Sequence, residues 1–110
     1  MGRGNTQGLA EYCRRVRSTT LAEVGPDRVL TYHGTQVAVL RGDGSIRLDS
    51  GGYKTMTTKA RMNAALSEDG LPWCVYQRDG VWFIMNIDNR ESIPFEDGII
   101  LGAPAGRKVK

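Results

Sequence analysis

The chain has 110 residues, of which 40% are hydrophobic and 25% charged, a composition typical of one small soluble domain. No run approaches the roughly 18 apolar residues of a membrane span, and no apolar segment behind the N-terminus resembles a secretory signal. We therefore expect a cytoplasmic protein without a membrane partner. Cys13 and Cys74 lack a CxxC spacing, which favours two free thiols over a disulfide, and a single histidine, His33, argues against a zinc site.

The net charge of +3 is unevenly distributed along the chain. Residues 1–19 and 106–110 hold seven basic residues and one acidic residue, a net +6, so the middle carries −3. Such ends are either solvated tails or electrostatic arms for a nucleic-acid partner. We expect residues 1–19 to form a basic N-terminal arm or helix, residues 20–105 an α+β domain, and residues 106–110 a basic C-terminal tail.

The first half of the chain predicts one helix and three strands. Apolar residues with helical spacing indicate a helix within residues 6–17; they are Leu9, Tyr12, Cys13 and Val16. Residues 28–32 and 36–41 are rich in β-forming side chains and flank the loop His33-Gly34-Thr35. A tight turn then leads to a third strand over residues 45–49, which completes an antiparallel meander.

The second half predicts a helix and a second hairpin. The helix covers residues 57–66, with Thr57 or Thr58 as its cap and Gly70 just past its end. Its apolar face toward the sheet consists of Met62, Ala65 and Leu66. An Asp-Gly turn joins strands over residues 73–78 and 81–85, and a polar loop over residues 88–92 precedes a last strand over residues 99–101. The fold class is a single small α+β domain, with an antiparallel sheet of about five to six strands, one central short helix and a possible N-terminal helix.

The strand over residues 81–85 is apolar on both of its faces. Val81, Phe83 and Met85 alternate with Trp82 and Ile84, and a chain of this size can cover only one face of its sheet well. The other face meets either a second subunit or a bound ring system. We expect a homo-oligomer, because uncovered apolar area usually marks an interface.

The segment of residues 50–63 is the best candidate for a ligand site. Its Gly-Gly pair allows positive φ and close backbone approach, and it leads into a helix start rich in hydroxyls, with cations in the first turns. Helix starts of this kind suit a phosphate, although a capped helix with solvated cations gives the same pattern, and the Walker A spacing is absent. Tyrosines near Lys54 and Arg78 are candidates for stacking on a base. The candidate ligand residues are Ser50, Gly51, Gly52, Tyr53, Thr55, Thr57, Thr58, Lys59, Arg61, Asn63, Tyr76 and Arg78.

Signals of catalysis are few. His33 lies in a predicted loop, and no recognisable motif ties a serine, cysteine or carboxylate to it. The aspartates lie mostly where turns favour them, so no paired-carboxylate site is evident. We expect a protein that is not an enzyme and uses no cofactor.

From about Tyr32 to Leu101 the chain resembles a widespread family of small phage-encoded proteins. The resemblance is carried by the motifs Tyr32-His33-x-Thr35, Ser50-Gly51-Gly52-Tyr53-x-Thr55-x-Thr57-Thr58-Lys59-x-Arg61-Met62-Asn63, Val75-Tyr76-Gln77-x-x-Gly80-x-Trp82 and Phe95-Glu96-Asp97-Gly98. Tyr53 stands where tryptophan is more frequent. The chain is also similar to anti-Thoeris proteins, which sequester cyclic ADP-ribose-type immune signals inside an oligomer. This resemblance implies aromatic and arginine side chains around adenine, and threonine, lysine and asparagine around phosphates.

The leading hypothesis is a non-enzymatic phage protein that binds a nucleotide-type ligand in the cytoplasm of an infected bacterial host. It would sequester a cyclic nucleotide or a cyclic ADP-ribose-like signal and so evade host defence. One alternative is a DNA- or RNA-binding accessory protein that uses the basic ends, whose binding would collapse with salt. Another is a protein–protein inhibitor of a host enzyme that acts through the uncovered sheet face.

Overall fold

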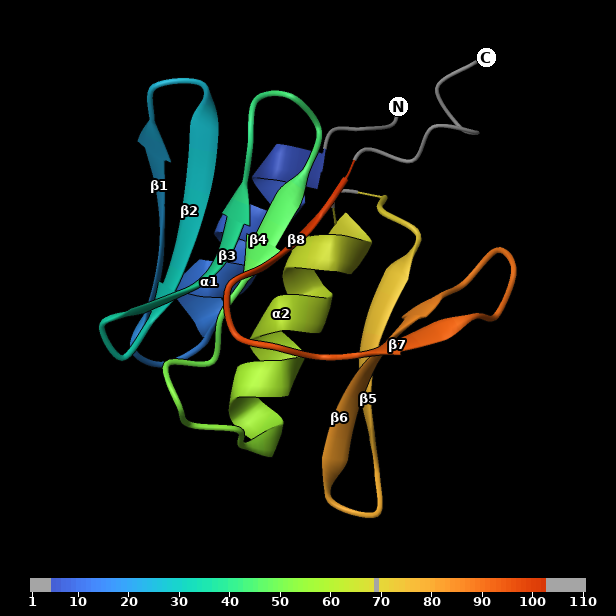
Figure 1. Cartoon of the computed structure of the whole chain (residues 1–110). Coiled ribbons are helices and arrows are strands. Elements are labelled where there is room, and N and C mark those ends of the chain that lie inside the picture. Colours follow the sequence, from blue (N-terminus) through green and yellow to red (C-terminus); the bar gives the residue numbers. More distant parts are fainter. Residues whose placement is uncertain (1–4, 69, 103–110) are drawn as a thin grey trace.

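A computed structural model describes residues 5–68 and 70–102 as two helices and eight strands (Figure 1). In chain order these are α1 (Asn5–Arg15), β1 (Thr19–Val24), β2 (Asp27–Tyr32), β3 (Thr35–Leu40), β4 (Ile46–Leu48), α2 (Met56–Glu68), β5 (Trp73–Arg78), β6 (Val81–Asn86), β7 (Ser92–Pro94) and β8 (Ile99–Leu101). The predicted α+β class is confirmed. No helix in the described ranges is long and apolar enough to span a membrane.

The strands form two antiparallel sheets, one of five strands in the order β1-β2-β3-β4-β8 and one of three in the order β5-β6-β7. Helix α2 lies between them and contacts β3 on one side and β5 on the other (Figure 1). We expected one sheet of about five to six strands, whereas the described residues form eight strands in two sheets. The second sheet is separate because the chain leaves the first sheet through α2. After β7 the chain crosses α2 and returns to pair β8 with β4.

The sequence pattern does not predict β1 or β7, and both are edge strands. β1 is mostly exposed, so it lacks a clean alternation of apolar and polar residues. β7 is exposed along its whole length and ends in Pro94, which an edge strand tolerates because one of its sides needs no ladder hydrogen bonds. The predicted meander and the hairpin around Asp79-Gly80 are confirmed as β2-β3-β4 and β5-β6.

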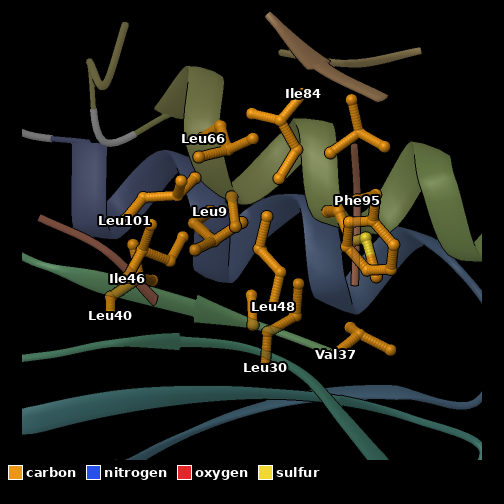
Figure 2. Packing of buried hydrophobic residues seen from close by; sticks show 14 of the residues in the cluster. Leu9, Leu30, Val37, Leu40, Ile46, Leu48, Leu66, Ile84, Phe95 and Leu101 are labelled. Atoms are coloured by element: carbon orange, nitrogen blue, oxygen red, sulfur yellow. The ribbon is translucent and has the colours of Figure 1, made fainter. Parts of the chain in front are cut away.

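The core lies where both helices pack between the sheets, and Figure 2 shows its side chains converging from α1, α2 and both sheets. The predicted N-terminal helix is confirmed: Leu9 is fully buried and Cys13 nearly so, and α1 packs against α2 and β1. From α2, the predicted inward face of Met62, Ala65 and Leu66 is buried. Cys13 and Cys74 are free thiols.

Helix α2 is capped by Thr55, and the prediction of Thr57 or Thr58 as the cap is wrong. The backbone N–H of Thr58 donates to Oγ1 of Thr55 at 3.1 Å, which is the spacing of an N-cap to the third helical residue. Thr57 is an exposed residue of the first turn, and Thr58 is buried beneath it. The helix therefore begins at Met56, one residue earlier than predicted.

The two faces of β6 differ as its sequence indicates. Trp82 and Ile84 are buried against α2, whereas Val81 is 53% exposed and Phe83 and Met85 are half-buried on the opposite face. Within the described chain this second face has no covering layer.

Candidate functional site

A cavity of about 320 Å³ lies between the β2–β3 turn, the loop before α2 and the start of α2. We call it the turn–helix pocket; it is lined by Tyr32, His33, Thr35, Val37, Ser50, Tyr53, Thr55 and Thr58. Small-molecule sites generally span about 300–1,000 Å³, so the cavity is near the small end of that range. Its lining joins residues 32–37 with residues 50–58, two segments that residues 38–49 separate in the sequence.

The loop before α2 is held by one buried serine. Both Oγ and the backbone N–H of Ser50 donate to Oδ1 of Asp97 at 2.7 Å, and the N–H of Gly52 donates back to Oγ of Ser50 at 3.1 Å. Gly51 has φ of 65°, and a Cβ at this position would lie 2.5 Å from Oγ1 of Thr35. Glycine is thus required where the loop passes β3, and this contact closes one side of the pocket.

The start of α2 forms the polar side of the pocket. Thr55 and Thr58 hydrogen-bond to each other, and the first-turn N–H groups of Met56 and Thr57 donate to no described residue. The free N–H groups and the partial positive charge of a helix start together attract an anion. Thr55 and Thr58 line the pocket at this helix start, so a phosphate oxygen in the pocket would lie near the positive end of α2.

Aromatic rings form another part of the pocket lining. Tyr32 is half-buried and makes an edge contact with the His33 ring, with ring centroids 4.5 Å apart. His33 adopts a positive φ of 50°, and its backbone N–H donates to the carbonyl of Ser18 at 3.0 Å, which fixes the turn. Tyr53 is 70% exposed at the rim. A planar ring that enters the pocket can stack on these side chains.

The sequence of this chain matches the family model described as Kyanoviridae Gp96 protein over residues 6–102. The chain belongs to this family. The predicted origin in a phage-encoded family is therefore confirmed, and the match extends the resemblance to include α1 and β1. No curated protein and no solved structure matches the chain.

In this Gp96-family chain, the structure brings together one half of the predicted ligand residues. Ser50, Tyr53, Thr55 and Thr58 line the turn–helix pocket, and Gly51 and Gly52 belong to the same loop. The prediction of ligand residues did not include Tyr32, His33, Thr35 or Val37. The motif Tyr32-His33-x-Thr35 was the available signal, since a polar and aromatic run at a hairpin turn often serves a site rather than the core.

The predicted lysine lies outside the pocket. Nζ of Lys59 is 3.4 Å from Oε1 of Gln77 and 5.9 Å from the centre of the Trp82 ring, so its side chain extends toward the three-stranded sheet. Lys54 likewise lies 5.8 Å over the Phe95 ring. Thr57 is exposed on α2. Among the described residues that line the pocket there is no lysine or arginine.

Arg61 is adjacent to the pocket without lining it. It is 8% exposed, its Nε donates to Oγ1 of Thr19 at 3.0 Å, and its Nη1 donates to the hydroxyl of Tyr12 at 2.9 Å. Its guanidinium carbon lies 5.0 Å from the ring centre of Tyr32 and 5.6 Å from that of Tyr12. Burial raises the pKa of the neighbouring Cys13 thiol, and the charge of Arg61 lowers that pKa by a smaller amount.

The three remaining predicted residues face the second sheet. Nδ2 of Asn63 donates to the carbonyl of Val75 at 2.9 Å and its Oδ1 accepts from the N–H of Val75 at 2.8 Å, so it attaches α2 to β5. Tyr76 stacks on Phe83 at 5.5 Å and its hydroxyl donates to Ser92. Arg78 is exposed at the end of β5. None of the three lines the turn–helix pocket.

Proposed function

We propose that this Gp96-family protein binds a nucleotide-type ligand in the turn–helix pocket and does not transform it chemically. The observation that carries the proposal is the convergence on one cavity of two tyrosines, a histidine and the hydroxyl side chains of Thr55 and Thr58 at a helix start. The aromatic side suits a base and the helix start suits a phosphate. The two requirements of a nucleotide are therefore met within the lining of one cavity.

The arrangement of polar groups favours binding over catalysis. His33 and Ser50 line the same cavity, and Asp97 is hydrogen-bonded to Ser50. In a hydrolytic triad the serine donates to histidine, and the histidine donates to the carboxylate. Here the serine is 1% exposed and donates directly to the carboxylate, so its hydroxyl is already used in holding the loop.

A binding protein that leaves its ligand intact acts by stoichiometric sequestration. Together with the phage origin of the family, this supports a role in removing a cyclic nucleotide or a cyclic ADP-ribose-like immune signal from an infected bacterial host. A ligand of two nucleotide units is large for a cavity of about 320 Å³. It would extend past Tyr53 at the rim, where a second subunit can complete the site. The uncovered face of β6, in the other sheet, offers apolar area for a homo-oligomer.

Differential scanning fluorimetry with a panel of nucleotides tests the proposal. The panel includes cyclic ADP-ribose isomers, cyclic di- and trinucleotides, mononucleotides and short single strands. Ligand at about a hundred times its dissociation constant adds roughly 2.7 kcal/mol, which raises the melting temperature of a domain this small by several degrees. We expect a shift with at least one small ligand, and chromatography of the recovered ligand should show that it is intact.

Two outcomes contradict the proposal. If no small nucleotide shifts the melting temperature, the pocket is not a nucleotide site. If a ligand binds but is recovered as a product, the protein is an enzyme. Binding of single strands alone, lost as salt rises, would instead support the nucleic-acid alternative. That alternative depends on the basic ends of the chain. Four of their basic residues lie outside the described residues, namely Arg3, Arg107, Lys108 and Lys110.

A further inference from the structure

Arg61 is a buried cation at the meeting point of four elements. It extends from α2, donates to Tyr12 of α1 and Thr19 of β1, and packs on the ring of Tyr32 at the end of β2. In the described part of the chain no carboxylate pairs with it. A guanidinium that is 92% buried without a counter-ion depends strongly on the few groups that hold it. We call this set of four residues the Arg61 junction.

Tyr32 belongs both to the Arg61 junction and to the lining of the turn–helix pocket. Among the four residues of the junction, Tyr32 is the one that lines the pocket, since Arg61, Tyr12 and Thr19 do not. A displacement of the Tyr32 ring therefore reaches the guanidinium directly. Packed interiors transmit such displacements because they contain little free space.

We infer that Arg61 is a positioning residue that couples occupancy of the turn–helix pocket to the docking of α1. A ring that stacks on Tyr32 restricts the Tyr32 side chain, the restricted ring holds the guanidinium by its cation–π contact, and the guanidinium keeps its hydrogen bond to Tyr12. Because coupling between sites is reciprocal, firm docking of α1 must strengthen ligand binding by the same factor. The part of this inference that concerns a bound ligand rests on the proposed function. The link between Tyr32 and α1 does not depend on a ligand.

Hydrogen–deuterium exchange tests the link without any ligand. The variants are Tyr32→Leu, which removes the ring that Arg61 packs against, and Tyr53→Leu, a matched change in the same pocket away from Arg61. We expect Tyr32→Leu to speed exchange of the α1 amides about tenfold, while Tyr53→Leu leaves them unchanged and Tyr32→Phe preserves protection. The amides of β5 and β6 serve as an internal reference for global unfolding. Equal α1 exchange in Tyr32→Leu and Tyr53→Leu overturns the inference.

The same exchange measurement in the presence of a nucleotide tests whether occupancy of the pocket affects the docking of α1. The probe is the nucleotide that gives the largest thermal shift, and we expect it to slow α1 exchange in the wild-type protein. In Arg61→Lys, which keeps the charge but loses the planar fork, the nucleotide should still bind and should no longer slow α1 exchange. Tyr12→Phe, which removes only the hydroxyl that accepts from Arg61, should weaken nucleotide binding about threefold to tenfold.

The outcomes separate the inference from the proposed function. If a nucleotide binds the wild-type protein but α1 exchange does not respond, the coupling is wrong and the proposed function stands. If no nucleotide binds, the proposed function fails, and the ligand-free comparison of Tyr32→Leu with Tyr53→Leu still decides whether the junction links the pocket wall to α1.

Discussion

Residues 50–58 and residues 59–63 form one continuous sequence motif, yet the structure gives them different surroundings. Side chains of the first segment line the turn–helix pocket, whereas Arg61 and Asn63 of the second bind α1, β1 and β5. The change occurs within the first two turns of α2, because each helical residue is rotated by about 100° from the one before it. A polar motif that is contiguous in sequence can thus combine a recognition surface with structural hydrogen bonds, and the residue types alone do not separate the two.

Substitutions in the two segments should therefore have different effects on stability and on binding. Changes in residues 59–63 should lower the free energy of unfolding. Any effect of these changes on nucleotide binding should follow from loss of folded protein or from weaker docking of α1. Changes at the pocket rim should lower affinity with little effect on folding. Changes at the loop glycines should affect both stability and affinity, because these residues shape the pocket through the backbone.

Asn63→Ala should have the largest effect on stability. It leaves the N–H of Val75 without a partner beneath α2 and leaves the Val75 carbonyl with only the weak contact from Sγ of Cys74 at 3.9 Å, and an unsatisfied buried group costs about 1–3 kcal/mol. We expect a loss of about 3 kcal/mol in the free energy of unfolding, measured by urea titration. Asn63→Asp, which keeps one acceptor, should lose less. A stable Asn63→Ala protein with impaired nucleotide binding would reverse the assignment of Asn63 to packing.

Gly51→Ala should rank next, with a loss of about 2 kcal/mol. The added Cβ would lie 2.5 Å from Oγ1 of Thr35, and the backbone φ of 65° is unfavourable for alanine. Gly52→Ala is the matched control: its φ is 86°, but nothing lies within 4 Å of the added Cβ, so its loss should be about 1 kcal/mol. Thermal melts of both variants measure the difference. Equal losses would show that the contact with Thr35 does not constrain the loop.

Tyr53→Ala should weaken nucleotide binding about tenfold, equivalent to about 1.4 kcal/mol, and should change stability by less than about 0.5 kcal/mol. Its ring lines the pocket and is 70% exposed, so folding depends little on it. Tyr76→Ala is the control, since Tyr76 stacks on Phe83 in the other sheet. Isothermal titration calorimetry should show unchanged affinity for Tyr76→Ala. Weaker binding by Tyr76→Ala than by Tyr53→Ala would place the ligand elsewhere.

The smallest expected effect concerns the Cys13 thiol. Burial raises its pKa above the ordinary value of 9.0, so above pH 9 the unfolded chain ionises while the folded chain stays protonated. Stability from this group is therefore complete below pH 9 and is lost as the pH rises toward the folded-state pKa. Between pH 8 and pH 10, the free energy of unfolding should fall further for the wild-type protein than for Cys13→Ala in urea titrations under reducing conditions. Parallel losses in both proteins would contradict a thiol that is buried by the docking of α1 on α2 and β1.

Much of the local structure follows from short-range signals. The Asp79-Gly80 turn predicts the β5–β6 hairpin, the periodic apolar residues of α1 and α2 predict both helices and their buried faces, and the two adjacent glycines predict a bend with positive φ. These signals are strong because each depends on a turn type or a period within a few residues. Edge strands such as β1 and β7 carry no such signal, because exposed residues are free to vary.

The sequence by itself determined the α+β class, most element boundaries and the segment that supplies half of the pocket. Only the tertiary structure decided which polar residues of that segment meet a cavity. It placed Tyr32 and His33 in the same pocket lining as Thr55 and Thr58, because the loop before α2 passes close to the start of β3, where Gly51 approaches Thr35. It also directed Arg61 toward α1. The physical reason is that hydrogen-bond partners distant in sequence are chosen by packing, and no local pattern of residue types encodes that choice.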